Sequence, residues 1–276
     1  MKKNMRVVLV TAEAAPFARA GKRAEFSAVL PKYLSSAGIA VSLVMPKYRT
    51  PEIDALETVL VLPEVLVPFG GDRVKAALHK AERQDFDLYL IDHPRYFQRE
   101  NIYGSPTGDY LDNDERFIFF CRAALEFLVR AGRSVDIIHS LDWPTALVPV
   151  FLKSHYARDK AFRKVRSVFT LHSPDCRGEF PAESLAWTGL DWDFLAPHKL
   201  SSNGKINLWK AGLAFADVVT AQEGGPLDTA QPERCGASLR EILKTRKDSF
   251  FCRRGKDGWR DYPALYEKAL SSRRGG

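Results

Sequence analysis

The sequence Arg6-Val7-Val8-Leu9-Val10-Thr11 runs directly into a small-residue stretch, and a helix-forming pattern follows as far as Gly38. The small-residue stretch reads Ala12-Glu13-Ala14-Ala15-Pro16-Phe17-Ala18-Arg19-Ala20-Gly21-Lys22-Arg23. The apolar run shows no polar–apolar alternation and therefore predicts a buried strand. A strand, a small-residue loop and a helix start together form the place where α/β proteins hold nucleotide phosphates.

Short apolar runs recur along the chain and alternate with amphipathic stretches. Strands are expected at 7–11, 41–45, 88–91, 137–139, 165–170 and 218–221, and helices at 24–37, 113–131, 145–155 and 206–216. This alternation predicts an α/β fold with one doubly wound, Rossmann-like parallel sheet and right-handed crossovers. Residues 58–90 break the rhythm with β-rich runs around Gly70-Gly71, which predicts a small antiparallel insertion.

The composition of the 276 residues is ordinary for a soluble globular protein, with 45% hydrophobic and 27% charged residues. No apolar run reaches the 18 residues or more of a membrane span, and the run at 7–10 is too short for a signal peptide. The cysteines form no CxxC pair and have no His at zinc-ligand spacing; they are Cys121, Cys176, Cys235 and Cys252. Free thiols in a cytoplasmic protein, with no metal site, are therefore expected.

The net charge of +7 is concentrated at the C-terminus. Residues 234–276 contain twelve Lys and Arg but five Asp and Glu, whereas residues 1–233 contain 29 of each sign. A solvated tail accounts for this segment. The alternative is a contact with an acidic partner or a nucleic acid, but no Lys/Arg-aromatic platform supports nucleic-acid binding. Helix patterns are expected within this segment at 239–247 and 263–271.

Several separated blocks share their order and spacing with one known family, from about residue 5 to residue 221. The blocks are Val10-Thr11-Ala12-Glu13-Ala14-Ala15-Pro16-Phe17, Leu30-Pro31, Val44-Met45-Pro46-Lys47-Tyr48, Tyr103-Gly104, Gly108-Asp109-Tyr110-Leu111-Asp112-Asn113-Asp114-Glu115-Arg116-Phe117, Ala123-Ala124-Leu125-Glu126, Asp136-Ile137-Ile138-His139-Ser140-Leu141-Asp142-Trp143, Val168-Phe169-Thr170-Leu171-His172 and Gly204-Lys205-Ile206-Asn207-Leu208-Trp209-Lys210-Ala211-Gly212. With these blocks the chain resembles bacterial glycogen synthases and plant starch synthases.

The resemblance implies the N-terminal half of a two-domain glycosyltransferase, in which two Rossmann-like domains face each other across a cleft. Such enzymes transfer glucose from ADP-glucose to the non-reducing end of an α-1,4-glucan, without a metal or another cofactor. It implies a domain over residues 1–221, followed by a basic, partly helical extension over 222–276 that faintly resembles the linker to the second domain. A separate chain that supplies this second domain is an expected partner, and no membrane contact is expected.

The resemblance places Arg19, Gly21, Lys22 and Glu25 in the substrate-binding loop, where the family carries Lys-Thr-Gly-Gly-Leu-Ala-Asp. Arg19 replaces the Lys that reaches the diphosphate, and its guanidinium still has the geometry to grip phosphate. Lys22 replaces the second Gly, which costs about 1 kcal/mol where φ must be positive. Two interpretations stay open: an anion site rebuilt from Arg19, Lys22 and Arg23, or a solvated basic loop that binds nothing.

By resemblance, His172 and Asp142 are the candidate catalytic residues, and His139 and Trp143 are substrate-binding candidates. His172 follows the strand at 165–170, where ligand crevices of α/β folds open, but a structural histidine is an equal alternative. Asp142 alternatively caps the helix that begins near Pro144. Trp143 alternatively serves as a buried anchor rather than a surface on which a sugar ring stacks.

The remaining substrate-binding candidates are Tyr110, Asn113, Asn207 and Lys210. In the family, the region of Tyr110 and Asn113 lines the glucan side, and Asn207 and Lys210 lie near the floor of the cleft. An ordinary helix N-terminus explains each pair equally well.

Three functional hypotheses follow. The first is a degenerate, non-catalytic relative of the synthase N-terminal domain that binds glucan or a partner, because Arg19, Lys22, Leu141 and Ser173 alter the donor site. The second is an active half-glycosyltransferase completed by a separate C-terminal domain chain. The third is a binder of an acidic partner or nucleic acid through residues 234–276, whose affinity would fall steeply with salt.

Overall fold

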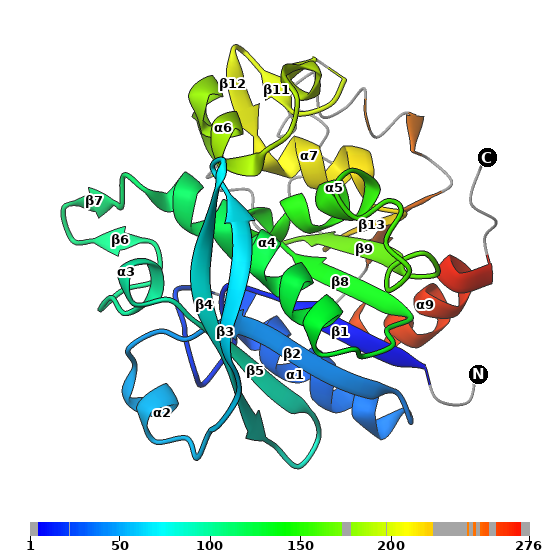
Figure 1. Ribbon diagram of the computed structural model, residues 1–276. Coiled ribbons are helices and arrows are strands. Elements are labelled where there is room, and N and C mark those ends of the chain that lie inside the picture. Colours follow the sequence, from blue (N-terminus) through cyan, green and yellow to red (C-terminus); the bar gives the residue numbers. More distant parts are fainter. Residues whose placement is uncertain are drawn as a thin grey trace.

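The computed structural model describes residues 5–21, 23–172, 178–196, 198–222, 242, 245–246, 249–253 and 258–271. A nine-stranded sheet in the order β14-β13-β9-β8-β1-β2-β5-β4-β3 forms its centre (Figure 1). The strands are β1 (Arg6–Val10), β2 (Ala40–Pro46), β3 (Val59–Phe69), β4 (Asp72–Glu82), β5 (Asp87–Asp92), β8 (Ile137–Leu141), β9 (Arg166–Leu171), β13 (Val218–Gln222) and β14 (Phe250–Arg253).

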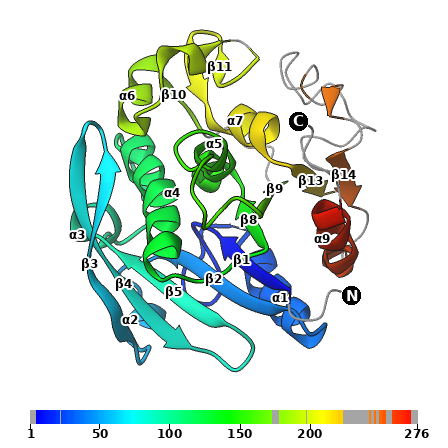
Figure 2. The same ribbon diagram turned by 45° about the vertical axis from the view of Figure 1, so that its right-hand side comes forward.

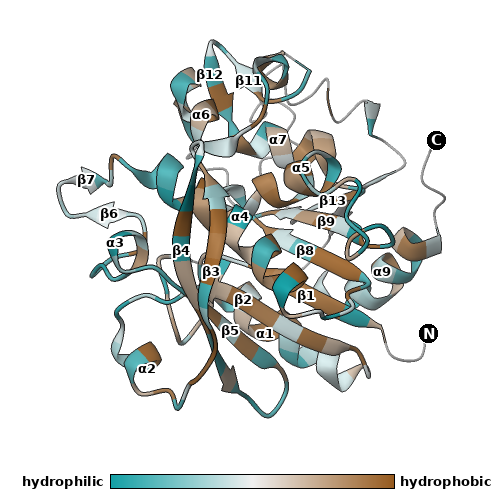
Figure 3. Cartoon of the chain, viewed as in Figure 1, coloured by the Kyte–Doolittle hydropathy of each residue, from teal (hydrophilic) through white to brown (hydrophobic). Residues whose placement is uncertain are grey.

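Every neighbouring pair from β14 to β5 is parallel, as the alternation of strands and helices predicts. Val8 of β1, for example, lies between Ser42 of β2 and Ile138 of β8. The central strands carry mostly hydrophobic residues (Figure 3), because both faces of a parallel sheet are covered. All six predicted strands are confirmed within one or two residues.

Helices cover both faces of the sheet, so the doubly wound α/β architecture is confirmed (Figure 2). One face carries α4 (Asn113–Arg130), α5 (Leu147–Lys153) and α7 (Leu208–Phe215); the other carries α1 (Arg23–Ser36) and α9 (Tyr262–Ser271). The side chains of β9 divide accordingly. Phe169 lies against Gly212 of α7, whereas Thr170 bonds to Tyr262 of α9.

The predicted antiparallel insertion is confirmed, and it is larger than the sequence indicates. The expected short runs merge into β3 and β4, two strands of 11 residues that extend the main sheet through β5, with register shifts between Leu60 and Val65. Trp187 packs against the tip of the hairpin, where a Cβ on Gly70 would lie 2.7 Å from its ring. Gly70 also has a φ of 59°. Glycine is therefore required there both by its backbone conformation and by the contact with Trp187.

Short elements fill the connections. They are α2 (Pro51–Asp54), α3 (Pro94–Phe97), β6 (Gly104–Ser105), β7 (Gly108–Asp109), η1 (Trp143–Thr145), β10 (Glu179–Pro181), η2 (Ala182–Ser184), α6 (Leu185–Thr188), η3 (Trp192–Leu195), β11 (Ser201–Ser202), β12 (Lys205–Asn207) and η6 (Gly258–Asp261). None of the helices in the described ranges is long and apolar enough to cross a membrane.

The described parts of the C-terminal segment pack on the sheet. Strand β14 pairs in parallel with β13, and Tyr262 and Tyr266 of α9 have no exposed surface. The helix expected at 263–271 is confirmed as α9. Of the helix expected at 239–247, residues 242 and 245–246 are described, and the rest of it lies outside the described residues, as does much of the basic segment 234–276.

Candidate functional site

The carboxyl ends of β1 and β8 bring together side chains that are distant in sequence. Glu13 follows β1, Asp142 follows β8, Arg23 begins α1 and Tyr103 comes from the segment before α4. Glu13, Asp142 and Tyr103 are 1%, 2% and 5% exposed, so they are taken out of water and must find partners within the protein.

The Glu13 carboxylate receives four hydrogen bonds. The backbone N–H groups of Ala20 and Gly21 donate to Oε2 at 2.9 and 3.1 Å. Arg23 Nε and the Tyr103 hydroxyl donate to Oε1, both at 2.9 Å. Backbone N–H groups in such a loop are the usual donors to a bound phosphate. Here two of them point at a carboxylate of the chain itself.

Arg23 joins this loop to the next strand end. Its Nη1 donates to Asp142 Oδ2 at 3.0 Å, and its guanidinium carbon lies 5.2 Å from the centre of the Tyr103 ring. Burial opposes the charge, but Tyr103, Asp142 and Glu13 together raise the pKa of Arg23 above its usual value. One partly buried cation, with 16% of its side chain exposed, thus bridges two buried carboxylates.

Asp142 has an unusual backbone conformation. Its φ of 63° and ψ of −179° lie in a region that residues with a side chain rarely adopt. Its Oδ1 accepts the Trp143 N–H at 2.8 Å, so the predicted capping role is confirmed, and Pro144 lies in the first turn that follows. Burial raises the pKa of the Asp142 carboxyl, and Arg23 offsets this only in part. Strain of this kind clusters at functional sites.

The other described residues of the loop are also paired. Arg19 Nη2 lies 3.0 Å from Glu25 Oε1, with 61% and 58% of the two side chains exposed. Such an exposed pair is weak, so Arg19 can leave Glu25 at little cost. Lys22 lies outside the described residues. Of the anion site that the sequence predicts, Arg23 is therefore engaged internally, while Arg19 remains at the surface.

The two candidate histidines have different surroundings. His139, with no exposed surface, lies beneath α9, where its Nδ1 is 2.7 Å from the Tyr266 hydroxyl and its Nε2 is 2.6 Å from Thr170 Oγ1. A substrate would reach it only after α9 moved. His172 follows β9, and the centre of its ring lies 4.2 Å from the centre of the Phe26 ring.

Trp143 and Asn113 are part of the packed interior beside the site. Trp143 is 1% exposed and meets the edge of Phe117, which matches a buried anchor. Asn113 Nδ2 donates to the Tyr103 carbonyl at 2.7 Å, and its Oδ1 accepts from Arg116. Tyr110 is half-buried, and the guanidinium carbons of Arg99 and Arg116 lie 4.8 and 5.1 Å from the centre of its ring.

Asn207 and Lys210 hold the start of α7. Asn207 Oδ1 accepts the Lys210 N–H at 2.9 Å as an N-cap, and its amide donates to Glu179. Lys210 is 2% exposed, and its Nζ donates to the Ser201 carbonyl at 2.7 Å. In this conformation both side chains serve local structure.

A polar hollow of about 430 Å³ opens next to the loop. It is lined by Arg19, Ala20 and Thr50 and by residues 100–106, 108 and 109. Asn101, Ser105 and Asp109 supply hydrogen-bonding side chains among its lining residues. Within the described ranges, His, Cys, Asp and Glu residues form no group of three that could hold a metal ion.

Sequence reasoning missed the centre of this arrangement. Glu13 and Tyr103 were noted only as parts of matching blocks, and Arg23 only as one of several loop cations. The one available signal was the substitution of the family's Leu by Arg23, because a cation at a buried position requires a carboxylate nearby.

Comparisons with known proteins agree with this fold and these blocks. The family described as "Starch synthase catalytic domain" matches residues 6–245. The chain is 36% identical over 247 residues to glycogen synthase 2 of Geobacter sulfurreducens and 34% identical over 248 residues to glycogen synthase of Geotalea daltonii. In both cases the match covers 90% of this chain and 51% of the relative.

A solved structure is similar as well. The catalytic domain of starch synthase IV from Arabidopsis thaliana, bound to ADP and acarbose, superposes with a TM-score of 0.79 at 30% identity. That match covers 90% of this chain and 51% of the other. The chain thus spans about half the length of the relatives it matches. Over that half it belongs to the family of starch and glycogen synthase catalytic domains.

Proposed function

We propose that this chain is a non-catalytic relative of the glycogen synthase N-terminal domain, which binds α-glucan and does not by itself transfer glucose from ADP-glucose. The observation that carries the proposal is Arg23, which stands where the family has Leu and donates to both Glu13 and Asp142. Glu13, which belongs to a block shared with the family, also accepts the Ala20 and Gly21 N–H groups. These are the donors that a diphosphate would need.

A diphosphate at this loop would have to displace Glu13. The displaced carboxylate would repel the incoming anion, and its removal from four donors would leave buried polar groups unsatisfied. Transfer between two domains also requires closure around the leaving group, which excludes water. One domain cannot provide that closure alone.

The polar hollow supports the glucan part of the proposal. Sugar hydroxyls are recognised by neutral donors and acceptors in a concave site, and Asn101 supplies such a group. The Thr50 and Ser105 hydroxyls also line the hollow, where they bond to Phe17 and Ile53 and to Thr107. The hollow is open to the surface next to Arg19, so a ligand enters without disturbing Glu13. We assign this hollow to one end of an α-1,4-linked chain.

Calorimetric titration of the purified chain with maltoheptaose and, separately, with ADP-glucose tests the proposal. We expect saturable binding of maltoheptaose, weakened in Asn101→Ala and unchanged in Gln84→Ala, an exposed amide elsewhere. We expect no binding of ADP-glucose and no glucose transfer. Turnover of ADP-glucose by the isolated chain would overturn the proposal.

A half-glycosyltransferase completed by a separate chain is the second candidate. The chain spans half the length of its relatives, and the strained Asp142 is retained at the strand end. This candidate predicts ADP-glucose binding that is lost in Arg19→Ala. It also predicts glucose transfer when the chain is mixed with the second half of Geobacter sulfurreducens glycogen synthase 2. If mixing restores no transfer and ADP-glucose does not bind, this candidate fails.

A further inference from the structure

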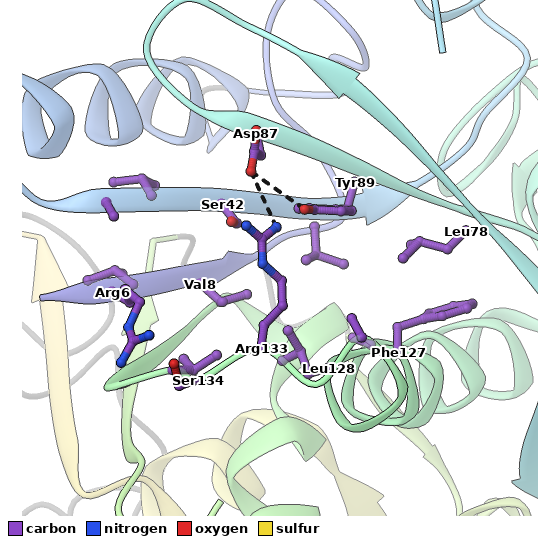
Figure 4. Close-up of a pocket in the computed structure, with 17 residues that line it drawn as sticks. Arg6, Val8, Ser42, Leu78, Asp87, Tyr89, Phe127, Leu128, Arg133 and Ser134 are labelled. Carbon is purple, nitrogen blue, oxygen red and sulfur yellow. Dashed lines mark hydrogen bonds and ion pairs between the residues drawn. The ribbon is translucent and has the colours of Figure 1, made fainter. Parts of the chain in front are cut away.

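A second hollow lies at the opposite end of the sheet. At the amino ends of β1, β2 and β5, a cavity of about 120 Å³ lies beneath the last turns of α4 (Figure 4). Most of its wall is apolar and includes Val8, Val44, Leu78, Ala124, Phe127 and Leu128. Its position separates it from the loop of Glu13 and Asp142, which follows the carboxyl ends of the strands.

The apolar wall selects the kind of molecule that fits. A water molecule in a cavity needs two to four polar partners, and an apolar cavity of similar size, about 150 Å³, stays dry and binds benzene. The space takes a single small ring or an aliphatic tail of a few carbons. Burial of such a tail is favourable because it removes apolar surface from water.

The mouth of the cavity is polar and carries charge. Figure 4 shows Arg133 reaching across the opening from the segment after α4 towards Asp87 of β5. Its Nη1 lies 3.3 Å from Asp87 Oδ2, and its guanidinium lies 5.4 Å from the centre of the Tyr89 ring. The side chains of Arg133 and Asp87 are 45% and 28% exposed, so water screens the pair and holds it weakly.

Asp87 does not depend on Arg133. Its Oδ1 lies 3.0 Å from Lys80 Nζ, and its Oδ2 accepts from the Tyr89 hydroxyl at 3.5 Å. Lys80 also contacts Glu82, and Arg6, the other cation in the lining, lies beside Asp136. Arg133 is therefore the rim cation that can turn to a ligand while Asp87 keeps another cationic partner. A guanidinium offers paired donors that match a carboxylate.

We propose that this cavity binds a small amphipathic carboxylate, with its short aliphatic or single-ring tail between α4 and the sheet and its carboxylate on Arg133. The tail contacts Phe127 and Leu128, and the carboxylate takes the place of Asp87 at the guanidinium. The site is independent of glucan binding.

Titration of the full-length chain by NMR with pentanoate, pentanamide and acetate tests the site. We expect pentanoate to bind saturably and to shift the amide signals of Phe127, Leu128 and Tyr89. Pentanamide lacks the charge and acetate lacks the tail, so both bind more weakly. Arg133→Gln weakens pentanoate about fivefold, the effect of losing one partly exposed ion pair. Arg130→Gln, which removes an equal charge from an exposed position outside the lining, leaves the affinity unchanged.

Filling the cavity provides an independent test. Ala124→Leu places a larger side chain in the space and abolishes pentanoate binding, and Ser42→Leu does the same from the sheet if Ala124→Leu does not fold. Equal pentanoate affinity in Arg133→Gln and the parent chain overturns the assignment of the carboxylate. Binding that persists in a folded filling variant, or the absence of saturable binding, overturns the site.

Discussion

The two ends of the central sheet differ in the kind of residue that they bury. At the carboxyl ends of the strands, the buried carboxylates of Glu13 and Asp142 share the partly buried Arg23. At the amino ends, apolar residues under α4 leave a cavity of about 120 Å³, and the charged groups stay at its exposed rim. In α/β folds, ligands generally bind at the carboxyl ends of the strands.

The difference shows how charged groups at the usual ligand-binding end of a sheet can bond to one another instead of to a ligand. Buried charges are tolerated only when they are paired and hydrogen-bonded, so a cation introduced at the family's Leu position fixes the carboxylates around it. Groups arranged in this way are engaged before any ligand arrives. An unfilled apolar space has no such internal partner and remains available. The end with more charged residues is therefore, in our view, the less receptive one to a charged ligand.

The largest expected effect is the removal of Glu13. In Glu13→Ala, Arg23 keeps Asp142 but loses its other carboxylate, and the N–H groups of Ala20 and Gly21 lose their acceptor. Loss of one partner of a buried pair costs about 3–5 kcal/mol in the free energy of unfolding. Urea denaturation followed by circular dichroism measures it.

The matched control for this change is Glu25→Ala. It breaks the exposed pair with Arg19 and costs less than about 1 kcal/mol. The double variant Glu13→Ala/Arg23→Leu is not expected to recover the loss, because it leaves the buried Asp142 carboxylate without its cation. Equal costs for Glu13→Ala and Glu25→Ala would contradict the difference between the two ends.

The architecture could be predicted from the sequence because its signals are local. Apolar runs such as Val7–Val10 need burial on both faces, and Gly38 ends the first helix with a φ of 77°. The capping role of Asp142 was predictable for the same reason, since it depends on Trp143 and Pro144 next to it.

The site could be predicted only in outline. The sequence identifies the strand ends, but the contact between Arg23 and Asp142 joins residues 119 positions apart and depends on the order of β1 and β8 in the sheet. The cover of His139 by Tyr266 was missed for the same reason, because 127 positions separate the two. The antiparallel insertion was predicted, but its extent as two strands of 11 residues was not, because Pro63 and the register shifts near it divide the strand pattern.

The second effect concerns the apolar end. Leu128→Ala enlarges the cavity and lowers the free energy of unfolding by about 2–3 kcal/mol, the lower part of the range for buried leucines. The value is low because Leu128 already borders empty space and has fewer neighbours to lose. Urea denaturation measures the cost, with Leu34→Ala, a fully buried leucine of α1, as the control that loses more. If Leu128→Ala costs more than Leu34→Ala, the space beneath α4 is filled in solution.

The third effect lies between the two ends, in the middle of β8. Tyr266→Phe removes the hydroxyl that lies 2.7 Å from His139 Nδ1. A buried hydrogen bond of this kind contributes about 1–2 kcal/mol, so the variant unfolds at a lower urea concentration. Tyr33→Phe, whose hydroxyl donates to the Arg260 carbonyl near the surface, is the matched control and costs less. An unchanged midpoint in Tyr266→Phe would mean that α9 does not cover His139.

The smallest effect is expected at the rim of the cavity. Arg133→Gln removes a pair that water already screens, and Asp87 keeps Lys80 at 3.0 Å, so the free energy of unfolding changes by less than about 1 kcal/mol. Comparison with Lys75→Gln, which breaks an exposed pair with Glu64, calibrates the measurement. A loss of more than about 2 kcal/mol in the free energy of unfolding would mean that Arg133 holds α4 to the sheet. Its guanidinium would then be as fully engaged as that of Arg23, and the two ends of the sheet would no longer differ in how readily they release a cation.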